Sequence, residues 1–178
     1  ACIGPFIGSY SDKKGNKKFL LFFLTLSGFI STLLLWFAKP GEEYLIFASI
    51  FSCLSMLSME LMFVLYNSLL SKTSSKRNIG QISGFAWCAG YIGGMISLII
   101  CLILFIFPEK LPFGFSKESG GDVRSCMLFI SLWLIIFCIP LFLFVEEPKK
   151  NKTSNNTLTY LGDGFKIIFK YKNILRYF

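Results

Sequence analysis

Four long apolar runs constrain this chain more than any other feature of its sequence. They cover residues 19–38, 44–70, 82–107 and 125–145. Because a helix rises about 1.5 Å per residue, about 20 apolar residues cross the hydrocarbon core of a bilayer. Backbone groups inside lipid must be satisfied within their own segment, so these runs predict helices rather than strands. The sequence therefore predicts an all-α integral membrane protein with four complete transmembrane helices.

The composition excludes most soluble classes of protein. Of the 178 residues, 54% are hydrophobic and only 16% are charged, and the mean hydropathy is +0.63. The chain contains no His, which excludes histidine proton relays and Ser–His–Asp catalysis, and it has no Walker loop. The six cysteines form no C-x-x-C pair and lie mostly in apolar runs, which favours buried thiols over a disulfide framework. We expect no enzyme activity, no cofactor and no metal.

The basic residues predict how the helices are oriented. Since spans alternate in direction, segments 1–18, 71–81 and 146–178 share one side of the membrane, and they hold 14 of the 18 Lys and Arg residues. The opposite side, residues 39–43 and 108–124, holds the other four together with five acidic residues. The positive-inside rule places the 14-residue side in the cytoplasm. The net charge of +8 is therefore interpreted as a topology signal and not as a nucleic-acid-binding surface.

The ends of the sequence predict a fragment with two parts. The chain begins with Ala1 rather than Met and ends inside an apolar stretch. Residues 1–146 are expected to form a partial transmembrane half. Residues 147–178 are expected to form a cytoplasmic linker, a short basic helix lying in the headgroup layer, and the start of a further span. A calmodulin-target-like peptide is an alternative interpretation of that basic helix.

A Gly–Asp–Gly loop precedes the first complete span. Its spacing is G-x-x-x-D-[RK]-x-G-x-[RK]-[RK], carried by Gly8, Asp12, Lys13, Gly15, Lys17 and Lys18. This spacing resembles the loop of the major facilitator superfamily between its second and third helices, although Asn16 stands where Arg is commonest. Gly15 permits a tight reversal of the chain. An ordinary basic turn would explain the lysines but not the glycine and aspartate spacing.

Further stretches narrow the resemblance. Residues 19–28, 59–70, 79–94, 140–148 and 172–178 resemble, in order and spacing, the autophagy-related vacuolar effluxer family, a branch of that superfamily with many bacterial members. The resemblance implies that the chain holds the end of helix 2, helices 3 to 6, the central linker and the first residues of helix 7. The expected fold is thus a partial N-terminal helix bundle of a major facilitator protein.

The resemblance also implies a function. It implies a secondary active transporter that moves a small solute by alternating access, in a bacterial cytoplasmic (inner) membrane that the chain crosses several times. The implied partners are the solute, protons as a coupling ion, the lipid bilayer and the missing C-terminal half of the same chain, with no nucleic acid. Amino-acid efflux is implied by analogy alone. The alternative is a non-transporting membrane scaffold or channel of four to six helices.

Glu60 is the only charged residue well inside a predicted span. A charge at the bilayer midplane costs roughly 2.5 to 3.5 kcal/mol on insertion scales, so such residues face a bundle interior. Ser49, Cys53, Glu60 and Asn67 fall within about 40° of one line along a helix. They predict a stripe for substrate and protons facing the cavity between two halves. The other interpretation is a carboxyl that hydrogen-bonds a neighbouring helix.

The third span carries a face of small residues. They are Ala86, Gly90, Gly93, Gly94 and Ser97. Small residues let two helix backbones approach closely in lipid. This face predicts helix packing, either static or as an interface that slides during a transport cycle. The aromatic residues beside it, Trp87 and Tyr91, are interpreted as interfacial or packing residues rather than substrate contacts.

Overall fold

A computed structural model describes residue 11, residues 16–73 and residues 78–145 of the chain. Its elements are α2 (Lys17–Leu34), η1 (Leu35–Phe37), η2 (Glu42–Tyr44), α3 (Leu45–Thr73), α4 (Ile79–Cys101), the π-helical turn η3 (Leu102–Ile106), η4 (Pro112–Gly114), η5 (Glu118–Gly120) and α5 (Gly121–Phe144). Four helices in this part of the chain are long and apolar enough to span a membrane. The prediction of an all-α protein with four complete spans is confirmed.

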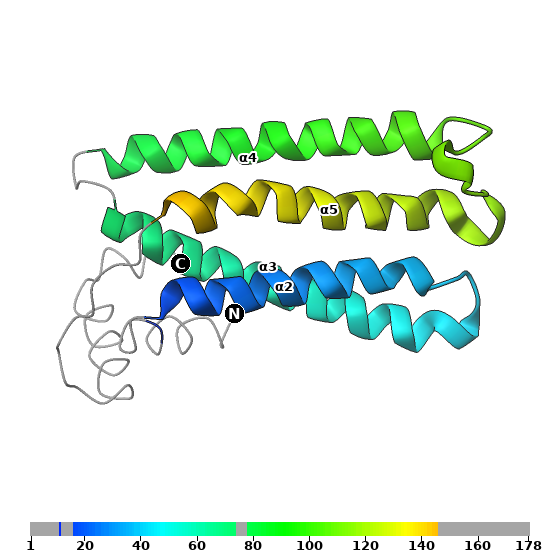
Figure 1. The fold of residues 1–178 in the computed structure, drawn as a ribbon, viewed down its shortest axis with the longest axis horizontal. Coiled ribbons are helices and arrows are strands. Elements are labelled where there is room, and N and C mark those ends of the chain that lie inside the picture. The colour runs from blue at the N-terminus through cyan, green and yellow to red at the C-terminus, as the bar shows by residue number, and fades with distance from the viewer. Residues whose placement is uncertain (1–10, 12–15, 74–77, 146–178) are drawn as a thin grey trace, which may run out of the picture.

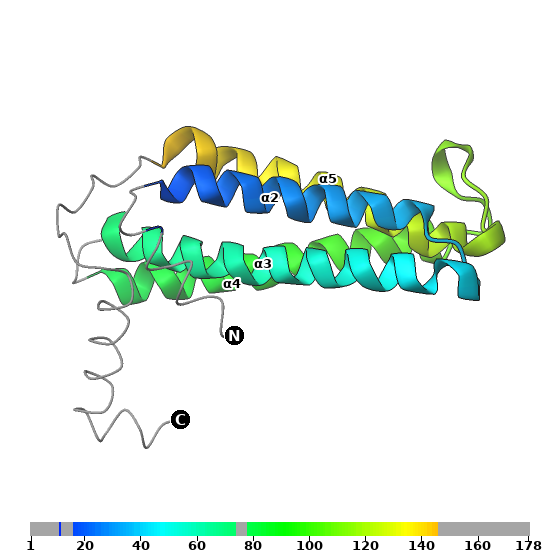
Figure 2. The ribbon, with the colours of Figure 1, turned by 90° about the horizontal axis from the view of Figure 1, so that it is seen from below.

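The four long helices run alternately up and down the bundle, as Figure 1 shows. α2 packs closely against both α3 and α5, whereas α3 and α4 contact each other sparsely. Turned by 90°, the bundle shows α2 beside α5 (Figure 2). We name the two ends after residues that lie there: the Lys17 end, where α2 begins, and the Pro40 end, where α2 and α3 are joined.

Two apolar clusters hold these helices together. The first joins α2 to α3 through the buried side chains of Leu21, Leu65 and Leu69. The second lies near the Pro40 end and joins α4 and η3 to α5 through Cys101, Phe105 and Cys126, with Leu111 beside them. Many other large apolar side chains are exposed, as expected for helices whose outer faces meet lipid rather than water.

Helix ends differ from the apolar runs by a few residues. α4 begins at Ile79 rather than at residue 82, and α5 begins at Gly121 rather than at residue 125. Hydropathy marks the part of a helix that lies in lipid, whereas backbone hydrogen bonding continues into the flanking polar turn. Pro140 lies inside α5, where it cannot donate a backbone hydrogen bond, yet the helix continues to Phe144.

The two connections at the Pro40 end touch each other at a glycine. Gly120 has φ +69°, and a Cβ built on it would lie 3.1 Å from Cγ of Pro40. The next residue is more restricted still, because a Cβ on Gly121 would lie 1.8 Å from the carbonyl oxygen of Ser116. The Gly120–Gly121 pair therefore lets the connection turn tightly into α5.

Candidate functional site

The predicted stripe of α3 lies on the face turned away from α2. The buried residues Ser58, Leu65 and Leu69 point towards α2. At 100° per residue, Glu60 falls on the opposite side of α3. Glu60, Ser49 and Cys53 are exposed, and Asn67 is half-buried. Three residues of the stripe are therefore exposed in the described part of the chain, whereas Asn67 is partly covered.

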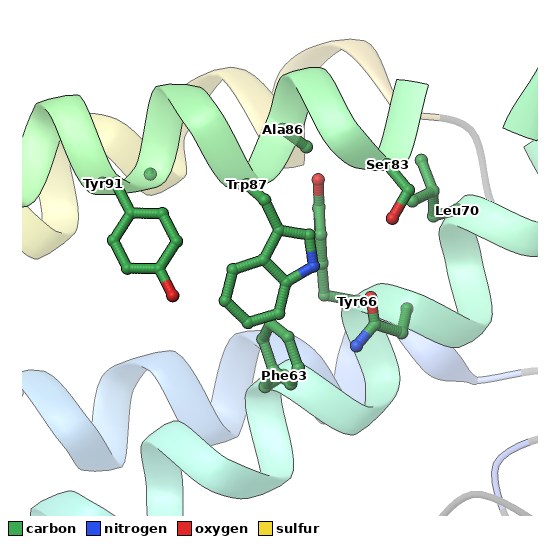
Figure 3. Close-up of a pocket in the computed structure, with 9 residues that line it drawn as sticks. Phe63, Tyr66, Leu70, Ser83, Ala86, Trp87 and Tyr91 are labelled. Atoms are coloured by element: carbon green, nitrogen blue, oxygen red, sulfur yellow. The ribbon is translucent and has the colours of Figure 1, made fainter. Parts of the chain in front are cut away.

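A pocket of about 380 Å³ lies between α3 and α4 (Figure 3). Its lining comes from one face of each helix: Phe63, Tyr66, Asn67, Leu70, Ser83, Ala86, Trp87, Gly90 and Tyr91. The pocket exists because α3 and α4 contact each other sparsely. Of the predicted stripe, Asn67 lines this pocket, whereas Ser49 and Glu60 do not.

Aromatic rings make up much of the pocket wall. The Trp87 indole extends from α4 towards α3 in Figure 3. Its ring centroid lies 5.1 Å from that of Phe63, edge-on at 70°, and 5.8 Å from that of Tyr91, tilted by 30°. Trp87 is 49% exposed and Tyr91 is 68% exposed, so neither residue is buried by the part of the chain that the structure describes. Both residues were expected to serve interfaces or packing, and the structure shows Trp87 packed edge-on against Phe63 while lining a cavity.

The polar groups of the pocket are neutral. Asn67 supplies an amide, Ser83 and Tyr66 supply hydroxyls, and Trp87 supplies an indole N–H. None of the nine lining residues carries a charge. Glu60 lies three residues before Phe63 on α3, and residues at that spacing are neighbours on a helix surface. A carboxylate is thus one helical turn from a neutral, mainly aromatic pocket.

The small-residue face of α4 is open in the part of the chain that the structure describes. A Cβ added to Gly90, Gly93 or Gly94 would meet nothing within 4 Å. Ala86 and Gly90 line the pocket, while Gly93 and Ser97 continue the face further along the helix. Its role in helix packing stays a prediction.

Close helix approach occurs instead at Gly28 of α2. A Cβ added there would lie 3.5 Å from Cβ of Ser58 and 3.9 Å from Cδ2 of Leu134. Gly28 is buried where α3 and α5 both pack against α2. Sequence reasoning missed this residue, although its neighbours Ser27 and Ser31 mark the same polar, small-residue stretch of α2.

Polar side chains pair along the contact between α2 and α3. Near the middle, Ser58 donates a hydrogen bond to the hydroxyl of Ser27 at 3.0 Å. Further along, the hydroxyls of Thr32 and Ser55 lie 2.9 Å apart. Thr25 lies 3.3 Å from the sulfur of Met62. The pairs follow one antiparallel register, since the partner's number on α3 falls as the number on α2 rises.

Lys17 continues this register at the Lys17 end. It is 1% exposed, and its ammonium group donates a hydrogen bond to the hydroxyl of Ser68. Of the six predicted loop residues, Lys17 and Lys18 fall within the described residues and begin α2. Gly8, Asp12, Lys13 and Gly15 lie outside them. The burial of Lys17 was not predicted, because a run of lysines beside a membrane indicates an exposed cytoplasmic loop.

Comparisons with known proteins decide the family. The model of the family described as "MFS/sugar transport protein" matches residues 1–178, which is the whole chain. The chain belongs to this family of major facilitator transporters. Four apolar helices in an all-helical bundle agree with part of such a transporter. This membership and the four apolar helices together indicate a membrane protein that crosses the bilayer several times.

The chain is similar to part of a longer protein. It is the uncharacterized MFS-type transporter YxiO of Bacillus subtilis (strain 168), 27% identical over 178 residues. The match covers 97% of this chain but 40% of that relative. No solved structure matches the chain.

Proposed function

We propose that this chain is the N-terminal part of a secondary active transporter that exports a small solute by alternating access. Residues 1–146 form part of its first half, with the end of helix 2 and helices 3 to 6, and residues 147–178 form the linker to helix 7 and the second half. The observation that carries this proposal is the family match over the whole chain, combined with a relative that is more than twice as long. The Bacillus relative supports a bacterial cytoplasmic membrane as its location.

Amino acids are the first solutes to test. This choice rests on the resemblance of five stretches to the vacuolar effluxer branch. The family match supports the superfamily and does not identify this branch. In this proposal the partners are the solute, a coupling proton and the second half of the same polypeptide.

Glu60 is proposed to carry the coupling proton. It is the one charged residue in the interior of the four described spans, and it is exposed on the face of α3 that is turned away from α2. Acidic residues inside membrane-spanning helices of transporters typically mark pathways for protons and substrates. Ser49 and Asn67 share the face of Glu60 and are proposed to line the same pathway.

The Gly–Asp–Gly loop is proposed to set the balance between inward-open and outward-open states. Lys17 supports this role, because it fixes the start of α2 to the end of α3 through Ser68. Lys17, which belongs to the loop signature, thus joins α2 to α3. Asp12 is proposed to contact a cation near the end of α3, with Lys72, Lys76 and Arg77 as candidates.

Transport by the complete polypeptide in proteoliposomes tests this function. Vesicles are loaded with single radiolabelled amino acids or small anions, and uptake and efflux are followed with and without an imposed pH gradient. Accumulation against a concentration gradient, driven by the pH gradient, is the expected result. Flux that only dissipates gradients would instead favour a channel, and no flux for any solute would favour a scaffold.

A further inference from the structure

We infer that the pocket between α3 and α4 takes an organic ammonium compound, a solute with one cationic amine and a flat or aromatic apolar body. This inference rests on the proposed function, because it names the chemical class of the transported solute. It is carried by three observations: the arrangement of the rings, the distribution of charge and the size of the cavity.

The rings are arranged to receive a cation. Trp87 presents an indole, which is the strongest aromatic partner for an ammonium group, and Tyr91 continues the wall at 5.8 Å between centroids. Phe63 contacts the edge of Trp87 and holds the indole extended from α4 towards α3. An ammonium within about 6 Å of such ring faces is attracted by their negative centres.

The charges near the pocket favour a solute with a positive charge. The nine lining residues carry neither a cation nor an anion, so a solute carboxylate finds hydrogen-bond donors but no cationic partner among them. On the α3 surface beside the pocket, Glu60 lies one helical turn from the lining residue Phe63. When it is ionised, Glu60 attracts an ammonium group and repels a carboxylate. An amine is therefore favoured over a carboxylate of the same shape.

The size and polarity of the pocket set the body of the solute. A volume of about 380 Å³ is at the small end of the range for ligand pockets. Ala86 and Gly90 bring no bulky side chain to the α4 wall of the pocket, which leaves room for a planar body. Asn67 and Ser83 offer the few hydrogen-bonding groups that orient a bound molecule.

Matched compounds test the inference in the complete transporter. The probes are phenethylamine, phenethyl alcohol, phenylalanine and galactose, which keep or remove the amine, the carboxylate and the aromatic body. Binding is measured by isothermal titration calorimetry in nanodiscs. Phenethylamine is expected to bind about tenfold more tightly than phenethyl alcohol, an effect within the range of a desolvated cation–π contact. Equal affinity for the amine and the alcohol would overturn the inference.

Single substitutions show whether phenethylamine binds in the pocket or elsewhere on the surface of α4. Trp87→Leu removes the indole and should weaken phenethylamine binding about tenfold, while Trp87→Phe keeps a ring and should weaken it about threefold. Phe85→Leu is the matched control, since Phe85 is 77% exposed on α4 and does not line the pocket. It should leave the affinity unchanged. An equal loss in Phe85→Leu and Trp87→Leu would overturn the assignment to this pocket.

Transport measurements distinguish failure of this inference from failure of the proposed function. If amino acids or galactose are transported and phenethylamine does not compete, the transporter stands and the ammonium class is wrong. If phenethylamine binds in a Trp87-dependent way but no solute is transported, the pocket stands and the transport function is wrong.

Discussion

Arg124 lies over the indole ring of Trp36, with its guanidinium carbon 4.7 Å from the ring centroid. The same guanidinium donates a hydrogen bond from Nε to the carbonyl oxygen of Trp36. Phe115 packs against the ring at a centroid distance of 5.1 Å. Trp36 belongs to η1 at the end of α2, and Arg124 lies in the first turn of α5. Trp36 therefore joins the end of α2 to α5, through Arg124, and to the connection before α5, through Phe115.

Replacing Arg124 should destabilise the bundle. Arg124→Ala removes both the ring contact and the hydrogen bond, and should cost about 1 to 3 kcal/mol of stability. Arg124→Lys keeps the charge but lacks the planar group that stacks on an indole, so its loss should be smaller. The midpoint of thermal unfolding in detergent, followed by circular dichroism, measures both. Lys110→Ala is the control, because Lys110 is an exposed cation on the same connection. An Arg124→Ala midpoint equal to that of Lys110→Ala would contradict the prediction.

The membrane orientation can be tested by labelling three positions. The distribution of basic residues places Ser74 and Asn155 in the cytoplasm and Ser119 on the far side. Single cysteines at these positions, in a background without other cysteines, are exposed to a membrane-impermeant thiol reagent. Ser119→Cys should react in intact cells, and the other two only after lysis. Labelling of all three from the same side would overturn the predicted topology.

Gly28 should tolerate one methyl group but no larger side chain. The Cβ of Gly28→Ala would make ordinary contacts at 3.5 Å and beyond, so stability should change by less than about 1 kcal/mol. Gly28→Leu must displace Ser58 or Leu134 and should cost at least about 1 to 3 kcal/mol. The yield of monodisperse protein and its unfolding midpoint report this loss. A stable Gly28→Leu protein would show that α2 and α3 do not approach closely here.

The same substitution on α4 tests the predicted small-residue face. Gly94→Leu should impair transport or folding if another helix packs on this face, because small residues permit that approach. Gly84→Leu is the matched control, since Gly84 lies on α4 outside the predicted face and also has nothing within 4 Å. Equal behaviour of the two variants would leave the face without a packing role.

Glu60→Gln should separate coupling from binding. The amide keeps the size and hydrogen bonding of the carboxyl but cannot take up and release a proton. We expect normal expression and normal exchange of solute across the membrane, with loss of accumulation driven by a pH gradient. Accumulation at the wild-type rate under the same gradient would show that Glu60 is structural and that coupling lies elsewhere.

Asp12→Asn should slow transport without lowering expression. An exposed ion pair contributes at most about 1 kcal/mol, yet a shift of that size changes an inward–outward equilibrium about fivefold. Initial rates of transport in proteoliposomes, normalised to protein, measure the effect. An unchanged rate would indicate that Asp12 only stabilises its turn.

The spans were predictable and their contacts were not, for one physical reason. Bilayer thickness fixes how many apolar residues a span needs, so residues 19–38 and 125–145 could be recognised from length and hydropathy alone. In lipid, however, apolar side chains do not reveal which face of a helix packs. The contact between α2 and α3 depends on Gly28, Ser27 and Ser58, which a search for apolar faces passes over.

The candidate site was predictable only in part. Glu60 stood out because a charge in an apolar run is costly, and Asn67 followed from helical spacing. The pocket wall did not follow, since Trp87 and Phe63 come from helices whose relative placement no sequence pattern revealed. The left-handed backbone at Phe113 and Ser119 was equally hidden, because neither residue type indicates a positive φ.

The antiparallel register of hydroxyl pairs restricts how this bundle can deform. If α2 slid along α3 by the rise of one residue, each hydroxyl would move about 1.5 Å from its partner. The pairs Ser27–Ser58 and Thr32–Ser55 would break together, and so would the bond from Lys17 to Ser68. Sliding of α2 along α3 is therefore disfavoured, because it breaks these hydrogen bonds. The register therefore favours movement of α2 and α3 together as one unit.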